Sequence, residues 1–104
     1  MKKLLMTTFL LLATSALAQP TVLVSINPYY DLLRQITGEL ATVIRILPPG
    51  AAPETFDPSP SDLRQMTKAD LVVLNGGLDE WLKDLVTASG SKAPVFEVLS
   101  ELDF

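Results

Sequence analysis

Four short apolar runs, rich in β-branched residues, recur along the chain. They are residues 22–24, 43–47, 71–74 and 95–99. Each run is continuous rather than alternating with polar residues, which is typical of strands buried on both faces of a parallel sheet. The pattern therefore predicts four parallel strands.

Helical spacing fills two of the connections between these runs. After the first run, apolar residues recur on one helix face, namely Tyr29, Leu32, Leu33 and Ile36. Asn27 is the expected N-cap of this helix, Pro28 lies in its first turn and Gly38 follows its end. After the third run the same spacing returns at Leu78, Trp81, Leu82 and Leu85. Tyr29 and Trp81 are expected to pack in the core.

A shorter helix is predicted before the third run. Ser59 is its expected N-cap, Pro60 its first residue and Asp62 the acidic partner of a capping box. Strands and helices thus alternate, and right-handed crossovers place helices on both faces of the sheet. The predicted fold class is α/β, a parallel sheet flanked by helices.

The loop from Leu47 to Asp62 is the most distinctive segment of the chain. Its five prolines restrict φ and remove backbone donors, so the loop holds its polar side chains in few positions. It presents one carboxylate, Glu54, as the candidate ligand of a binding site. The alternative is that Glu54 is a solvated loop residue, with Asp57 in a turn.

Ligands of parallel sheets bind beyond the carboxyl ends of the strands, where three loops are expected to meet. Asn27, Glu54 and Asn75 are therefore expected to line one rim. For the segment Asn75-Gly76-Gly77 a plain turn between strand and helix is the alternative to ligand contact.

A secretory signal peptide is predicted for residues 1–18. Lys2 and Lys3 precede an apolar stretch that ends in Ala16-Leu17-Ala18, so cleavage is expected after Ala18. The stretch is shorter than a membrane-spanning helix, and no cysteine stands at the cleavage site for lipid attachment. The expected product is periplasmic and carries no membrane anchor.

Charge and composition exclude several classes of function. Without Lys2 and Lys3, six basic residues face twelve acidic ones, a net charge of about −6 that disfavours nucleic acid as a partner. The chain has no His and no Cys, so a metal would find only oxygen ligands here. With no imidazole, thiol or phosphate-binding loop, an enzyme is not expected.

The ordered motifs resemble the zinc/manganese-type solute-binding proteins of bacterial ABC importers, also called cluster A-I. Residues 24–32 are similar to the family's first strand and helix, residues 48–62 to its signature loop, and residues 69–82 to its next strand and helix. The resemblance covers about the first third of a family member. Residues 19–104 are therefore expected to form an incomplete N-terminal lobe of a two-lobed protein.

The resemblance implies capture of a divalent transition metal, zinc or manganese, and its delivery to an ABC permease in the inner membrane. The family's first ligand, usually His, falls at Glu54. A carboxylate is a harder ligand and favours manganese or iron relative to a His-rich zinc site. The other ligands would lie beyond Phe104, so weak or absent metal binding is expected of this chain alone.

Two other interpretations remain open. The chain is either a truncated remnant that no longer binds, or a small exported module that pairs its unfinished sheet edge with another chain. A module of this kind would be dimeric in solution.

Overall fold

The computed structural model describes residues 19–102, and the predicted signal peptide of residues 1–18 lies outside them. Four parallel strands form one sheet in the order β2-β1-β3-β4. The strands are β1 (Thr21–Val24), β2 (Thr42–Arg45), β3 (Leu71–Leu74) and β4 (Val95–Glu97). The predicted parallel sheet is thus confirmed.

The strands that the apolar runs predicted are slightly shorter in the structure. β2 ends at Arg45, although the backbone N–H groups of Ile46 and Leu47 still bond to Val24 and Ser25 at the end of β1. β4 ends at Glu97, where a 3-10 helix begins. The second apolar run continues past β2 because Ile46 and Leu47 stay buried. The fourth run continues past β4 because the chain turns into this 3-10 helix, where Val98 packs against the core.

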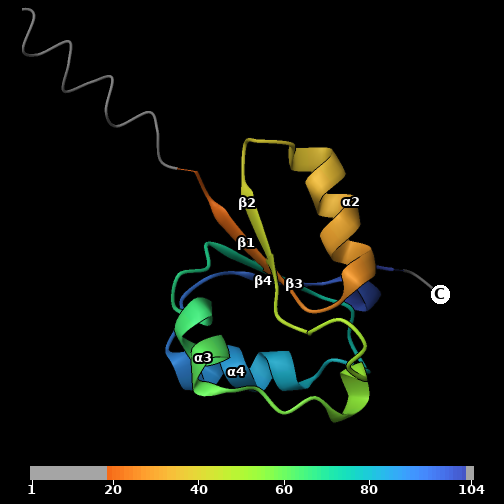
Figure 1. Ribbon diagram of the computed structural model, residues 1–104, viewed down its shortest axis with the longest axis vertical. Coiled ribbons are helices and arrows are strands. Elements are labelled where there is room, and N and C mark those ends of the chain that lie inside the picture. Colours follow the sequence, from red (N-terminus) through yellow and green to blue (C-terminus); the bar gives the residue numbers. More distant parts are fainter. Residues whose placement is uncertain (1–18, 103–104) are drawn as a thin grey trace, which may run out of the picture.

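Helices cover both faces of the sheet (Figure 1). They are α2 (Asn27–Thr37), α3 (Pro60–Met66) and α4 (Trp81–Ser89), with 3-10 turns η2 (Pro53–Thr55) and η3 (Val98–Glu101). α2 lies on one face, and α3 and α4 lie together on the other. The alternation of side chains along each strand serves both layers: Leu23 and Val72 face α3 and α4, whereas Val22 and Val73 face α2.

The predicted apolar face of α2 is only half covered. Tyr29 and Leu33 pack against the sheet, but Leu32 is 53% exposed and Ile36 is 69% exposed. Two of the four residues on the predicted apolar face therefore lie outside the core. The apolar stripe is wider than the surface that the described part of the sheet offers it.

Two of the expected helix starts also differ from the structure. Ile26, in extended conformation, is the N-cap of α2, and Asn27 is already the first helical residue. α4 begins at Trp81, so Leu78 lies in the preceding turn. By contrast, the capping box of α3 is confirmed: Ser59 Oγ accepts from the N–H of Asp62, and an Asp62 carboxylate oxygen accepts from the N–H of Ser59 at 2.8 Å.

The last strand leaves apolar surface open. Val95 is 42% exposed and Phe96 is 45% exposed. Within residues 19–102, no helix has both the length and the apolar character needed to cross a membrane.

Candidate metal centre at the carboxyl edge of the sheet

Three loops leave the carboxyl ends of β1, β2 and β3 at the same edge of the sheet, as a parallel arrangement requires (Figure 1). The longest is the predicted proline-rich loop, which crosses from the end of β2 to α3. A turn closes at its start, where the N–H of Ala51 donates to the carbonyl of Pro48 at 3.2 Å. Glu54 follows in the single turn of η2, and its side chain is exposed.

Trp81 contacts the loop on both sides of Glu54. Its indole Nε1–H donates to the carbonyl oxygen of Pro53 at 2.7 Å. Its ring meets the ring of Phe56 in an edge-on arrangement, with centroids 4.8 Å apart and planes at 64°. Since Pro53 and Phe56 flank Glu54, these contacts fix the backbone from which the carboxylate projects.

The Glu54 side chain borders an open hollow of about 330 Å³. Glu80 and Asp84 line the same hollow from the start of α4. Glu80 is already engaged, because it accepts the backbone N–H of Gly77 at 2.8 Å and forms an ion pair with Lys83 at 2.9 Å. Those two contacts lower the pKa of Glu80, the Gly77 hydrogen bond having the larger effect. Within residues 19–102, Glu54 has neither a hydrogen bond nor an ion pair through its side chain.

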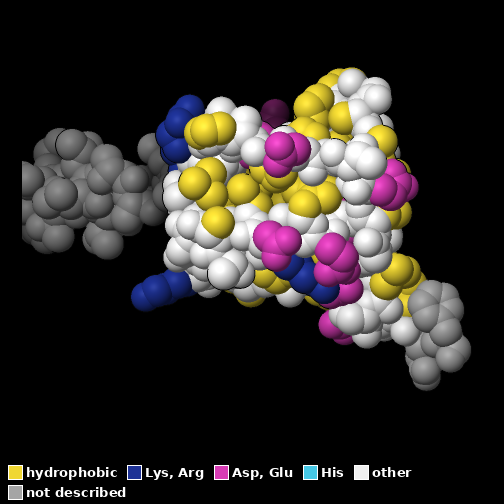
Figure 2. Space-filling model, turned by 90° about the horizontal axis from the view of Figure 1, so that it is seen from below, with side chains coloured by type: hydrophobic (Ala, Val, Ile, Leu, Met, Phe, Trp, Pro, Cys, Tyr) yellow, Lys and Arg dark blue, Asp and Glu magenta, His cyan; other side chains and the backbone are white. Residues whose placement is uncertain are grey.

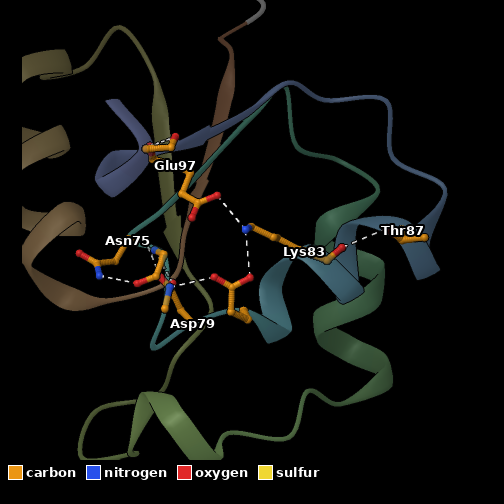
Figure 3. Close-up of polar contacts among 9 residues, drawn as sticks. Asn75, Asp79, Lys83, Thr87 and Glu97 are labelled. Carbon is orange, nitrogen blue, oxygen red and sulfur yellow. Dashed lines mark hydrogen bonds and ion pairs between the residues drawn. The ribbon is translucent and has the colours of Figure 1, made fainter. Parts of the chain in front are cut away.

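Beneath this hollow, a buried carboxylate holds the turn between β3 and α4. Asp79 is fully buried and accepts three hydrogen bonds: from Ser25 Oγ at 2.5 Å, from the N–H of Asn75 at 2.7 Å and from the N–H of Gly76 at 2.8 Å. Figure 3 shows Asp79 beside Asn75 at this turn. A buried carboxylate is stable when its oxygens are satisfied in this way. Asp79 therefore ties the ends of β1 and β3 to the start of α4.

Asn75, expected on the rim, is used inside the protein. Its side-chain oxygen accepts from Tyr29 Oη at 2.5 Å, and its amide nitrogen donates to the carbonyl of Gly76 at 2.8 Å. Burial, with a smaller contribution from the negative charge of Asp79, raises the pKa of Tyr29. Tyr29 is partly buried and packs against the core cluster of Val22, Val24 and Val73, in agreement with its predicted core position.

Asn27 also lies away from Glu54. Its amide nitrogen donates to Asp31 at 3.1 Å, and its side-chain oxygen accepts a hydrogen bond from Arg45. Together with Arg45, Asn27 borders a separate hollow of about 300 Å³ beside residues 47–51. Within residues 19–102, no hydrogen bond joins Asn27, Glu54 and Asn75 to one another. The loops meet at one edge as predicted, but their polar side chains do not form one rim.

Lys83 closes the side of this edge that faces β4. Its ammonium group lies 2.7 Å from a carboxylate oxygen of Glu97 and 2.9 Å from one of Glu80 (Figure 3). These two acidic partners raise the pKa of Lys83, Glu97 having the larger effect. The Glu97 side chain also covers Gly76, where a Cβ would lie 2.5 Å from its oxygen. The φ of Gly76 is 98°, a conformation that favours glycine independently of this contact.

The described residues do not complete a metal site. No group of three or more Asp, Glu, His or Cys side chains in residues 19–102 is arranged to hold a metal ion. The three carboxylates that line the hollow, Glu54, Glu80 and Asp84, do not form such a group. Figure 2 shows acidic side chains around an apolar area on the face seen from below, with few basic side chains among them.

Sequence reasoning missed Asp79, Ser25 and the indole N–H of Trp81. Trp81 was expected only as a core residue, and it does pack against the core. The sequence pattern that could have predicted the role of Asp79 is its place three residues after Gly76, in the turn between a strand and a helix. At this spacing a carboxylate can reach back and accept from free backbone N–H groups. Ser25 gives no such signal, since its partner lies 54 positions away.

Comparison with known proteins decides the family. The family described as "Zinc-uptake complex component A periplasmic" (ZnuA) matches residues 22–103. The chain belongs to this family. The match to the ZnuA family includes the Glu54 loop, the Asp79 turn and all four strands, so the resemblance of the motifs to metal solute-binding proteins is confirmed.

Relatives of the ZnuA family match the same part of the chain. A protein of Thermotoga maritima is 40% identical over 84 residues, which cover 80% of this chain and 31% of the relative. The manganese-binding lipoprotein MntA of Halalkalibacterium halodurans is 40% identical over 74 residues, which cover 70% of this chain and 24% of the relative. The chain spans less than a third of the length of these two relatives.

Solved structures of the ZnuA type share the fold. The solute-binding protein FpvC of Pseudomonas aeruginosa, in complex with Ni²⁺, superimposes with a TM-score of 0.75 at 27% identity. The similarity covers 83% of this chain and 33% of FpvC. The described residues therefore adopt the α/β architecture of one part of a metal solute-binding protein.

Proposed function

We propose that this chain is part of the substrate-binding component of an ABC importer, which captures a divalent transition metal in the periplasm and delivers it to an inner-membrane permease. The family match over residues 22–103 and the metal-binding relatives support this role. The signal peptide of residues 1–18, cut after Ala18, supplies the route of export. The role is binding and transfer, not catalysis.

The observation that carries the proposal is the presentation of Glu54. A loop stiffened by five prolines and held by Trp81 projects one carboxylate with no intramolecular partner within the described residues. Oxygen ligands suit manganese and iron better than they suit a site selective for zinc. Glu54 is therefore the ligand that this part of the protein supplies, with manganese or iron favoured over zinc.

A single carboxylate binds such a metal weakly. Water fills the remaining coordination positions, and the metal exchanges rapidly. The resemblance implies that the other ligands come from sequence beyond Phe104. For this chain alone we expect millimolar binding at best.

Weak binding at Glu54 can be located by NMR with Mn²⁺, whose unpaired electrons broaden the signals of nearby nuclei. We expect submillimolar Mn²⁺ to broaden the amides of residues 53–56 and 77–81 first. Glu54→Gln should abolish this selective broadening, because the amide side chain has no charge. Glu39→Gln, an exposed glutamate between α2 and β2 at the opposite edge of the sheet, is the matched control.

Two outcomes would contradict the proposal. Broadening spread evenly over all exposed carboxylates would make Glu54 a solvated loop residue, as the remnant interpretation requires. Tight calorimetric binding of Mn²⁺ or Zn²⁺ that persists in Glu54→Gln would place the site elsewhere. In either case the chain would still belong to the ZnuA family, but Glu54 would not be its metal ligand.

A further inference from the structure

Trp81 is the only tryptophan of the chain, and it occupies the first position of α4. The Trp81 side chain is half-buried between the core and the proline-rich loop. Its indole N–H points at the Pro53 carbonyl rather than at solvent. A buried indole N–H normally finds a hydrogen-bond partner, and the partner here is a carbonyl on the loop, 28 positions earlier in the chain.

The loop is held by the packing of Phe56 against the buried core cluster and by few hydrogen bonds. Within the described residues, the bond from Trp81 is the only hydrogen bond that joins residues 48–58 to the rest of the protein. The prolines restrict the loop internally, yet they also remove the backbone donors with which it might bind the sheet or helices. Internal stiffness alone does not set where a loop sits on the molecule. Its position therefore depends on Trp81 and on the adjacent ring of Phe56.

Trp81 is itself fixed from below. Two residues before it, Asp79 binds the backbone of Asn75 and Gly76 and the hydroxyl of Ser25. One residue after it, Leu82 is fully buried. The indole thus projects from a turn and a helix that are anchored on both sides of it, which suits a residue that orients a second group.

We propose that Trp81 is the positioning residue for Glu54. Its indole N–H, by holding the Pro53 carbonyl, keeps the Glu54 carboxylate over the start of α4, so that a metal bound there stands at a fixed distance from residues 77–81. Trp81 does not touch the metal. The consequence for metal binding rests on the proposed function, whereas the docking of the loop does not.

The test compares Trp81→Phe with Tyr29→Phe by backbone NMR relaxation. Trp81→Phe keeps an aromatic ring but removes the N–H donor, and Tyr29→Phe removes a hydrogen bond at the same edge without touching the loop. We expect order parameters of Glu54 and Thr55 to fall from about 0.85 to below about 0.6 in Trp81→Phe and to stay unchanged in Tyr29→Phe. An unchanged, rigid loop in Trp81→Phe would overturn the proposal.

Mn²⁺ broadening adds a readout that general destabilisation does not alter. In Trp81→Phe, broadening should persist at residues 53–56 and decrease several-fold at residues 77–81, because the carboxylate no longer stays over α4. Equal broadening at both segments would overturn the proposal. If Mn²⁺ does not select Glu54 in the unmodified protein, the proposed function fails, while the order parameters still decide the role of Trp81.

The hydrogen-exchange rate of the Trp81 indole N–H tests the proposal in the unmodified protein, so this test does not depend on whether a variant folds. The indole N–H of Trp81 should exchange with solvent at least tenfold more slowly than that of a free tryptophan. Exchange at the free rate would show that the bond to Pro53 is not kept in solution, and the proposal would be wrong.

Discussion

Replacing Asp79 with Asn tests whether one buried carboxylate holds the carboxyl edge of the sheet together. The substitution preserves shape and removes the charge. In the native protein, one Asp79 oxygen accepts from Ser25 Oγ and from the N–H of Asn75, and the other accepts from the N–H of Gly76. An asparagine has only one acceptor oxygen, so its NH₂ group must face at least one of these donors.

The cost follows from the bonds that are lost. A hydrogen bond to a charged group contributes about 1.5–3 kcal/mol, and a buried donor left without a partner costs about 1–3 kcal/mol. Because Gly76 is buried as well, the unfavourable pairing cannot be relieved by water. We expect Asp79→Asn to lower the free energy of unfolding by about 3–5 kcal/mol. A domain of this size has a total of about 4–13 kcal/mol, so the loss is a large part of its stability and approaches the whole of it at the lower end of that range.

Urea denaturation followed by Trp81 fluorescence and by circular dichroism measures this change. Ser25→Ala is the control, because it removes one donor and leaves Asp79 with two backbone partners. A loss of about 1.5–3 kcal/mol, the value of one hydrogen bond to a charged group, is expected for it. An Asp79→Asn variant that lowered the free energy of unfolding by less than about 1 kcal/mol, while the slope of that free energy with urea concentration stayed the same, would refute the reasoning. The carboxylate would then be replaceable by any group of its shape.

Further predictions concern the neighbours of this turn. Gly76→Ala should destabilise the fold by at least about 1–3 kcal/mol in urea denaturation, because Gly76 has a φ of 98° and the new Cβ would lie 2.5 Å from a Glu97 oxygen. Adding Glu97→Ala should restore the part of the stability that the clash removes. If it restores none, the whole loss comes from the positive φ at position 76. The pKa of Glu80 is lowered first by the Gly77 N–H and then by Lys83, so its stabilising effect is present above the ordinary pKa of a glutamate and is lost as the pH falls through the lowered value. In an NMR titration, Lys83→Gln should raise the Glu80 pKa only part of the way, and a return to the ordinary value would contradict the larger role of Gly77.

Local patterns were sufficient to predict most of the fold. Continuous apolar runs gave the strands because helices lie on both faces of the sheet and bury most of β1 and β3. Ser59 with Asp62 gave the start of α3 because a capping box depends on residues three apart. Asn27 was misjudged as an N-cap. Its side chain is instead engaged by Arg45, which β2 brings alongside from 18 positions away.

The candidate site was less predictable for the same reason. The proline-rich loop and Glu54 are visible in the sequence as a motif. The contacts that place them are not, since Pro53 and Trp81 lie 28 positions apart and Ser25 and Asp79 lie 54 apart. Such pairs become neighbours only once the strand order is known. Sequence reasoning therefore identified the ligand candidate and missed the residues that hold it.

Rigid presentation of one ligand has a specific value for a site that other residues must complete. Ordering a flexible charged side chain and its loop on binding costs free energy that is subtracted from affinity. Here the turn at Asp79 fixes the indole of Trp81, and the indole fixes the carbonyl next to Glu54, so this cost is met during folding. The buried carboxylate and the exposed one are therefore linked in a single chain of contacts. In the role proposed for Glu54, loosening either contact between the two carboxylates is expected to lower metal affinity while leaving Glu54 itself unchanged.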